Sequence, residues 1–251
     1  MVGGVETPRL VAWITIRNVT LGMMRTMARQ AHQQQRTDRS SPDAAAPESA
    51  PPSPRLGRPR SERARSDVLA AAGALLEEGG LPLVTIEAVS ARSGVGKPTI
   101  YRYWPNRLAV AIDAFAAHMA REVPSADLGD ARSDLTEQVR RVAAFYATHA
   151  GTVLTQLLGA TAADPAAARQ LRDRFLAGRW AETTRMWQRA VERGEVRAEI
   201  SPEVAIDALF SPIIYRLLVR NAPIDPEAAA AIAEAALGGL LSPPPSADGT
   251  S

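Results

Sequence analysis

The residues whose types and spacing could do chemistry lie between Thr85 and Arg107, a stretch that reads TIEAVSARSGVGKPTIYRYWPNR. A short segment with an apolar face runs into Gly94, and a second short segment begins at Lys97 and carries basic, hydroxyl and aromatic side chains. A helix, a glycine-centred turn and a second helix form the geometry that lays one helix across the DNA backbone and the next in the major groove. The pattern therefore predicts a helix-turn-helix at about residues 86–105.

The second helix of this motif carries side chains that can bind DNA. Lys97 is the only lysine among 29 basic residues, and from the first turn its ammonium can reach guanine O6 and N7 or a phosphate, with plain solvation as the alternative. Pro98 suits that turn because its missing N–H would have no partner within the helix. Arg102 can pair bidentately with guanine. Three hydroxyl side chains share this outward side and can donate to bases or phosphates: Thr99, Tyr101 and Tyr103.

The neighbouring helix starts and the segment before the first helix add further candidates. Thr85 and Asn106 can each cap a helix, and Arg107 follows the second cap. Free N–H groups and the positive end of the helix dipole bind phosphate at such positions. Arg58 and Arg60 stand in a Gly-Arg-Pro-Arg stretch that resembles an AT-hook and suits a narrow minor groove if it is extended. A solvated arm is the alternative for these two arginines.

Helices are also expected on both sides of the motif. Apolar residues recur at helical spacing from about Ser61 to a stop at Gly79-Gly80. Asp164-Pro165, Ser201-Pro202 and Asp225-Pro226 each combine a capping residue with proline at the first helical position. The sequence has no sustained β-branched alternation and no Asn-Gly or Asp-Gly hairpin between such runs. The expected fold is all-α, with an N-terminal three-helix helix-turn-helix domain followed by a C-terminal helical bundle.

The order of compositions along the chain predicts four regions. Residues 1–56 are expected to be a disordered N-terminal extension, because residues 28–54 are rich in Gln, Ser, Ala and Pro. The DNA-binding domain is expected at residues 57–122, the helical domain at 131–241 and a disordered polar tail at 242–251. The apolar stretch near the start is too short to span a bilayer and lacks a cleavage site, and Met23, Met24 and Met27 offer later starts of translation.

Composition excludes several classes of function. The chain has no cysteine, which rules out disulfides, thiolate metal sites and thiol catalysis. It also lacks a Gly-x-Ser-x-Gly motif and a phosphate-binding glycine loop, so neither an enzyme nor a cofactor is expected. His118 and His149 have no second ligand at metal-binding spacing, and no metal is expected. Residues 55–121 hold ten basic and six acidic side chains, whereas residues 122–251 hold thirteen and seventeen, an asymmetry that suits phosphate binding at one end.

Taken together, these residues resemble the TetR family of transcriptional regulators. The similarity covers roughly Ala64–Pro124 and rests on a pattern of small, hydroxyl and aromatic residues: Thr85, Val89, Ser93-Gly94-Val95-Gly96, Thr99-Ile100-Tyr101, Tyr103, Trp104 and Arg107. Three mild departures are Ser90 for alanine, Trp104 for phenylalanine and Arg107 for lysine. The resemblance implies that Tyr101 contacts a phosphate or a thymine methyl group, and packing in the core is the alternative. It also implies that the C-terminal bundle binds a small effector and forms a dimer.

Candidate residues for those two roles come from the apolar side chains of the C-terminal half. Most aromatic residues beyond the helix-turn-helix fall between positions 145 and 187, and an ordinary core is the alternative to a pocket. The expected effector pocket comprises Phe145, Tyr146, Leu157, Leu158, Phe175, Trp180, Met186 and Trp187. The expected dimer interface uses the last two helices, with Phe210, Ile213, Ile214 and Leu217 on the first of them.

The function expected from these features is a homodimeric DNA-binding regulator that a small molecule releases from a palindromic operator. It would be a repressor of the bacterial cytoplasm, associated with the nucleoid, with double-stranded DNA, an effector and its own copy as partners and no membrane. The alternative is an architectural or ligand-independent DNA-binding protein, which would need no hollow bundle. An enzyme is the rival of a different class, and no motif in the sequence favours it.

Overall fold

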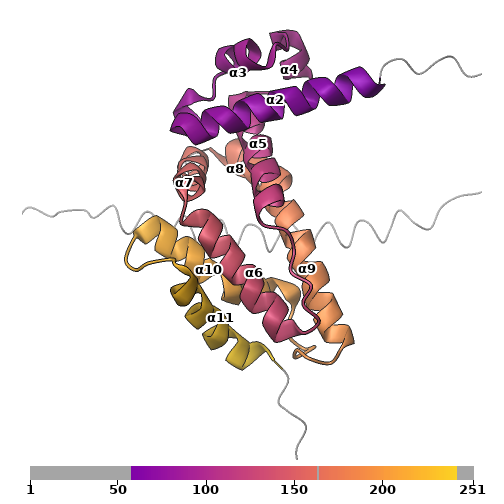
Figure 1. Cartoon of the computed structure of the whole chain (residues 1–251), viewed down its shortest axis with the longest axis vertical. Helices are drawn as coiled ribbons and strands as arrows, with labels where there is room; N and C mark the ends of the chain where they lie inside the picture. The colour runs from indigo at the N-terminus through magenta and orange to yellow at the C-terminus, as the bar shows by residue number, and fades with distance from the viewer. Residues whose placement is uncertain (1–57, 163, 242–251) are drawn as a thin grey trace, which may run out of the picture. The chain divides into compact units, whose positions relative to one another are not determined.

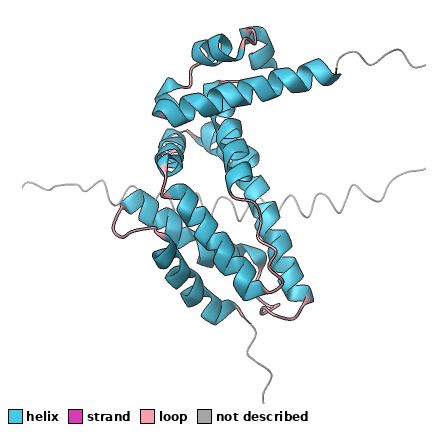
Figure 2. Cartoon of the chain, in the orientation of Figure 1, coloured by secondary structure: helices cyan, strands magenta, loops and turns pink. Residues whose placement is uncertain are grey.

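The computed structural model describes residues 58–162 and 164–241, and the expected N-terminal extension and C-terminal tail lie outside this part of the chain (Figure 1). Within the described residues the structure is helical (Figure 2). Its β pairing is limited, among these residues, to one bridge between Val196 and Leu241. The all-α prediction is therefore confirmed. Among these same residues, no helix is both long and apolar enough to cross a bilayer.

The first group of helices contains the helix-turn-helix motif. Helix α2 crosses and packs against α5, and α3 packs against α2 (Figure 1). Their shared core includes Val68, Val89, Ile100, Trp104 and Ile112, all nearly or completely buried. The elements are α2 (Arg58–Gly79), a 3-10 turn η1 (Leu81–Leu83), α3 (Ile86–Ser93), α4 (Lys97–Tyr103) and α5 (Arg107–Glu122).

The second group forms a helical bundle in which α6 packs against α11, α7 and α9, and α10 packs against α9 and α11. Its elements are α6 (Ala131–Tyr146), α7 (His149–Thr161), α8 (Pro165–Leu171), a π-helical turn η2 (Arg172–Leu176), α9 (Ala177–Glu192), α10 (Pro202–Val219) and α11 (Pro226–Leu240).

The predicted start signals of this bundle are confirmed. The side chains of Asp164, Ser201 and Asp225 each accept a hydrogen bond from a backbone N–H in the first turn of α8, α10 and α11. Helix α10 continues through Pro212, so the proline removes one backbone donor without ending the helix. Helix α6 begins at Ala131, because Asp130 caps it by accepting from Ser133 N at 2.9 Å.

Side chains of the bundle hold the connection between α5 and α6. The carboxylate of Asp134 accepts from Leu128 N at 2.5 Å, and Gln138 Oε1 accepts from Ala126 N at 3.0 Å. Both side chains are buried, although they are polar. These bonds satisfy Gln138 Oε1 and one oxygen of Asp134, since a buried polar group needs a partner. The other Asp134 oxygen accepts no hydrogen bond and lies 3.6 Å from Arg193 NH2. The link between the two groups of helices is thus anchored at two backbone N–H groups, although most of its residues are exposed.

Candidate nucleic-acid interface

The turn between α3 and α4 is built by glycine and by two serine side chains. Gly94 has φ 70°, a left-handed conformation that favours glycine, and its N–H donates to Ser90 O at 3.0 Å. The Ser90 hydroxyl donates to Val95 O at 2.8 Å, and Ser93 Oγ accepts from Val95 N at 3.2 Å. At the other end of α3, the Thr85 hydroxyl accepts from Ala88 N at 3.0 Å, as the sequence predicted. These bonds fix where α4 begins.

Helix α4 has one buried face and one exposed face. Ile100 and Trp104 are buried in the core and form the inward face. Lys97, Pro98 and Arg102 are exposed, and the side chain of Tyr101 is 52% exposed. An aromatic residue so exposed on a short helix is not a core residue, so the packed alternative for Tyr101 is wrong. The exposed face is free to contact another molecule.

Lys97 is held by a carboxylate in the structure. Its Nζ lies 2.6 Å from Glu87 Oε1 on α3, with both side chains about half exposed or more. The hydrogen bond from Lys97 lowers the pKa of Glu87 and raises that of Lys97. The ammonium has three N–H donors and one of them is engaged by Glu87, so this carboxylate competes with any phosphate or base for Lys97. Glu87 could not be identified from the sequence, because the helical spacing within α3 does not reveal contacts with α4.

Arg102 and Tyr103 form a pair at the exposed end of α4. The guanidinium of Arg102 donates to the Tyr103 hydroxyl at 2.9 Å and lies 4.9 Å from the centre of its ring. The Tyr103 ring in turn packs edge-on against Trp104 at a centroid distance of 5.7 Å. The Tyr103 ring is therefore partly buried, and its hydroxyl accepts a hydrogen bond from Arg102. The hydroxyl can still donate its own hydrogen to a phosphate, as expected from the sequence. Stacking of this kind orients Arg102 before any ligand binds.

Asn106 and Arg107, two further candidates for DNA binding, both make contacts within the protein at the start of α5. Asn106 caps the helix by accepting from Ala109 N at 2.9 Å, as predicted. Arg107 donates to Leu81 O at 3.3 Å and so bridges α5 to the η1 turn. Both residues are exposed, which leaves the N-terminus of α5 accessible. Arg107 therefore has a structural contact in addition to any phosphate that it binds.

One sequence expectation for this surface is wrong. Arg58 and Arg60 were expected in an extended arm before the first helix, whereas both belong to the first turn of α2. Pro59 is compatible with this position, because a proline near a helix start loses no intrahelical hydrogen bond. An AT-hook needs extended backbone in the minor groove. The helical conformation removes that basis for the two arginines.

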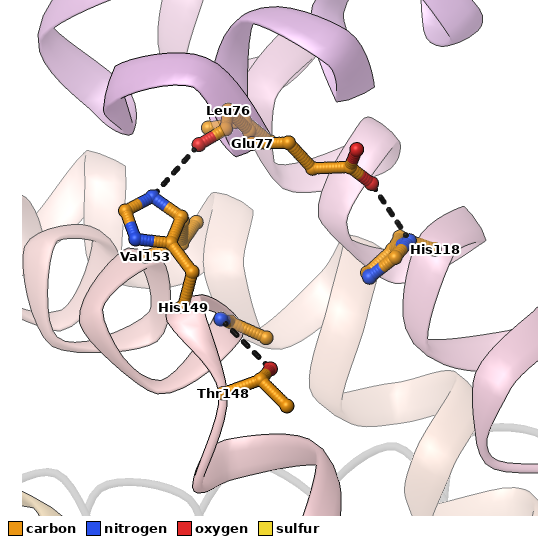
Figure 3. Close-up of a pocket in the computed structure, with 7 residues that line it drawn as sticks. Leu76, Glu77, His118, Thr148, His149 and Val153 are labelled. Carbon is orange, nitrogen blue, oxygen red and sulfur yellow. Dashed lines mark hydrogen bonds and ion pairs between the residues drawn. The ribbon is translucent and has the colours of Figure 1, made fainter.

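A small cavity lies where α2 and α5 meet α7 (Figure 3). It has a volume of about 200 Å³, and Glu77, His118 and His149 are among its lining residues. The ring of His149 is 3.1 Å from Leu76 O, and His118 Nδ1 is 3.5 Å from the Glu77 carboxylate (Figure 3). In the part of the chain that the structure describes, no three side chains form a metal-binding group. The cavity is smaller than the roughly 300–1,000 Å³ typical of small-molecule sites.

The expected effector-pocket residues are mostly core residues in this structure. Phe145, Tyr146, Leu157, Phe175, Met186 and Trp187 are buried, whereas Leu158 and Trp180 are partly buried. Phe115 joins this group, with its ring centroid 5.8 Å from Phe145 and 5.3 Å from Phe175. Burial raises the pKa of the Tyr146 phenol well above its usual range, so this group is neutral. Three of the eight residues, Phe145, Tyr146 and Phe175, thus belong to one cluster of aromatic rings around Phe115.

Of these eight residues, Trp187 lines a larger surface groove. The groove has a volume of about 630 Å³ and lies between the end of α9 and the start of α10. Val191, Ile200 and Pro202 form apolar parts of its wall, and Glu192 and Glu199 add carboxylates. Its size falls within the range of small-molecule sites.

The four expected dimer residues differ in their burial within the single chain. Ile213 is completely buried within a single chain, and Phe210, Ile214 and Leu217 are partly buried against the same core. The large apolar residues of α10 that are most exposed are Val204, Tyr215 and Val219, with exposures of 51, 45 and 47%. Because α10 is apolar on nearly all sides, its periodicity did not show which face is turned inward.

Comparison with known proteins also identifies a helix-turn-helix DNA-binding domain followed by a C-terminal helical domain. Residues 68–114 match the family model described as bacterial regulatory proteins of the tetR family, and residues 125–236 match the tetracyclin repressor-like C-terminal domain. The HTH-type transcriptional regulator YdeS of Bacillus subtilis is 34% identical over 152 residues, which cover 61% of this chain and 77% of that protein.

Two further similarities are informative. The HTH-type regulator Mb1581 of Mycobacterium bovis is 28% identical over 158 residues, covering 63% of this chain and 78% of the relative. The crystal structure of the TetR family transcription regulator SCO0332 superposes with a TM-score of 0.67 at 32% identity, covering 70% of this chain and 98% of the other. These relatives are regulators and not enzymes. With its helix-turn-helix and both family domains matched, the chain belongs to the TetR family of transcriptional regulators.

Proposed function

We propose that this regulator is a homodimeric repressor that reads a palindromic operator with α4. The observation that carries the proposal is the exposed face of α4, where Lys97, Tyr101 and Arg102 point away from the core. Arginine and lysine can bind guanine edges, and tyrosine can bind phosphates, so one short helix supplies both positioning and readout. A repressor bound to its operator works on the bacterial chromosome, and its place is therefore the cytoplasm.

Dimerisation is proposed through α10 and α11. The exposed side of α10 carries Val204, Ala208, Ser211, Tyr215 and Val219 at spacings of three and four residues, which places them on one stripe. On α11 the exposed positions include Ala231, Ala235 and Gly238, whose small size lets another helix approach closely. Two helices from each chain would then form a four-helix interface around a two-fold axis. The same axis matches the symmetry of a palindromic operator.

Effector release is proposed to act through the groove beside Trp187. An effector that binds there contacts the end of α9 and the start of α10, so it can change how these helices pack. Its effect on DNA affinity is limited by its differential affinity for the two conformations, typically ~1–3 kcal/mol. Ala198→Trp would fill the groove from an exposed position. This variant is expected to bind DNA normally and to lose its response to any compound that releases the wild-type protein.

The ligand-independent alternative is favoured by one observation, which is the packing of the predicted pocket aromatics into the core. A screen of small molecules for release of bound DNA separates the two functions. Compounds that release wild type but not Ala198→Trp support the effector-controlled repressor. A chain that no compound displaces, although it binds DNA specifically, supports the alternative.

DNA reading itself is tested by selecting bound duplexes from a random-sequence library with the wild-type chain. We expect an enriched palindrome whose half-sites lie about one helical turn apart. Lys97→Ala should weaken binding to this duplex while leaving helicity unchanged, because the Lys97 side chain is about half exposed and pairs with the exposed Glu87. Failure to enrich any sequence would contradict specific readout. Enrichment with an unchanged affinity for Lys97→Ala would remove Lys97 from the interface.

A further inference from the structure

The C-terminal end of α4 is held by a side chain that follows it. Trp104 comes directly after the helix and is 1% exposed, and its backbone N–H donates to Ile100 O. Its indole N–H is a donor only, so burial requires an acceptor nearby. Asp113 Oδ2 on α5 supplies it at 2.7 Å. The position of Trp104, and with it the end of α4, therefore depends on a carboxylate of α5.

That carboxylate is shared with a residue far along the chain. Arg174 NH1 donates to the same Asp113 Oδ2 at 2.8 Å, across 61 residues of sequence. The Asp113 side chain is 12% exposed, which makes its charge costly without a partner. Arg174 is the cation that satisfies this charge in the structure. One oxygen atom thus joins the end of α4 to the helical bundle.

The backbone around Arg174 is unusual. In the turn Arg172–Leu176 the N–H of Ala177 donates to Arg172 O, five residues back, which is the π-helical pattern. A π turn accommodates one extra residue and rotates the next helical segment relative to a regular helix, and such turns are frequent at functional sites. This turn places Phe175 in the core against Phe115 on α5. The same turn directs Arg174 to Asp113, also on α5.

We infer that Arg174 is a positioning residue for DNA binding, acting through Asp113 and Trp104 on the orientation of α4. The inference rests on the proposed reading of DNA by α4. Arg174 contacts no DNA-facing residue itself, and it lies outside the residues that match the DNA-binding family model. Its function is to hold the Asp113 carboxylate in place, so that Trp104 keeps the end of α4 fixed. Specific binding needs this fixed orientation, whereas non-specific attraction to phosphate does not.

The test compares Arg174→Met with wild type on two DNA probes. One is the duplex selected by the wild-type chain, and the other is a duplex of scrambled sequence at the same salt concentration. We expect Arg174→Met to lose about tenfold in affinity for the selected duplex, because the loss of one charge-assisted hydrogen bond corresponds to a factor of that size. The affinity for the scrambled duplex should not change. The salt dependence should not change, because no phosphate contact is removed. Arg132→Met, which removes an exposed ion pair with Glu234, is the matched control and should bind like wild type.

A spectroscopic signal separates positioning from a general loss of structure. The indole N–H resonance of Trp104, assigned by its disappearance in Trp104→Phe, should shift and exchange faster with solvent in Arg174→Met. A double variant of Arg174→Met and Trp104→Phe should have the same operator affinity as whichever single variant binds less tightly. Both substitutions break the same series of contacts from Arg174 through Asp113 to Trp104, so their effects should not add. If Arg174→Met does not fold, Asp113→Asn replaces it, because the amide keeps the shape and removes the charge.

The outcomes decide between three accounts. Three results together support the inference: Arg174→Met loses affinity for the selected duplex, the Trp104 resonance shifts, and the affinity loss of the double variant is smaller than the product of the two single losses. Unchanged affinity in Arg174→Met and Asp113→Asn, while Tyr101→Ala loses binding, overturns it and leaves the reading by α4 intact. Independent, multiplicative losses in the double variant also overturn it. If Tyr101→Ala binds like wild type as well, the proposed reading by α4 is itself wrong.

Discussion

Helices α4 and α10 are both partly exposed, but they differ in how clearly their sequences show which face is outside. Helix α4 has only seven residues, and its one buried residue, Ile100, is flanked by polar or exposed residues. The sequence of α4 therefore shows which face is outside. In α10 apolar residues occur on nearly every side, and the buried Ile213 is followed two residues later by the half-exposed Tyr215. A short polar helix with one anchor is therefore easier to interpret than a long apolar one.

This difference matters because both helices carry proposed contacts with another molecule. For α4 the outward candidates Lys97, Tyr101 and Arg102 are exposed in the structure. For α10 the candidate Ile213 lies in the core of the single chain. Substitutions on the two faces of α10 should therefore differ in their effects on folding and assembly. Substitutions in the helix-turn-helix should instead change operator affinity.

The largest effect is expected for Ile213→Glu. Because Ile213 is completely buried within one chain, the carboxylate would have no water and no partner. We expect a loss of about 3–5 kcal/mol in the free energy of unfolding, the range for an uncompensated buried charge. Thermal unfolding followed by circular dichroism measures it. A variant that unfolds at the wild-type temperature and is only dissociated would place Ile213 in the interface after all.

Tyr215→Glu should act on assembly rather than on folding. Tyr215 is 45% exposed, so a carboxylate at this position remains hydrated in a monomer, but it must be desolvated in a dimer interface. We expect a folded monomer with weakened operator binding, measured by sedimentation velocity at micromolar concentration. A variant that stays fully dimeric would move the interface away from this stripe. A wild-type chain that is itself monomeric would refute the homodimer.

Two glycines offer a matched pair for the next effect. Gly94, in the turn before α4, and Gly194, after α9, have φ of 70° and 69°, and an added Cβ at either meets no atom within 4 Å. Alanine should therefore cost about 1–2 kcal/mol at each, from backbone conformation alone. Only Gly94→Ala should also lower operator affinity beyond the loss of folded protein, because its turn fixes α4. Equal operator affinities for the two folded variants would contradict the role of that turn.

The smallest effect is an increase. Glu87→Gln removes the carboxylate that holds Lys97 and that faces the DNA in the proposed complex. We expect operator affinity to rise by about two- to fivefold at low salt and less at high salt, as for an exposed ion pair. Glu234→Gln removes the same charge from α11, where it pairs with Arg132, and should leave affinity unchanged. A decrease for Glu87→Gln would show that Glu87 supports DNA binding.

Local signals predicted much of the fold and of the α4 surface. Thr85, Asn106 and Asp225 cap helices as expected, since a cap depends on the next three residues only. Gly94 forms the expected turn for the same reason. The arm of Arg58 was wrong, because Pro59 is compatible with either an extended segment or a helix start.

Features that depend on distant contacts were not predictable. The π turn at Arg172–Leu176 leaves no mark on periodicity, and the pairing of Arg174 with Asp113 spans 61 residues. The aromatic residues of the bundle were recognised as a group, but whether they line a pocket or fill a core depends on how several helices pack. The groove beside Trp187 likewise combines residues of α9 and of the segment that leads into α10. Sequence patterns along one helix do not contain this information.

The central claim is that α4 reads DNA, and two exposed tyrosines test it most directly. Tyr101 on α4 is 52% exposed and Tyr215 on α10 is 45% exposed, so replacement of either by alanine removes the same group from a solvated position. The measurement is a gel-shift titration of both variants on the selected duplex at one salt concentration, with protein well above the dimer dissociation constant. We predict that Tyr101→Ala loses about 1–3 kcal/mol of binding free energy even as a complete dimer, while Tyr215→Ala, which changes only the proposed dimer interface, binds like wild type once it is fully dimeric. Equal affinities for Tyr101→Ala and wild type, or equal losses in both variants, would contradict the claim.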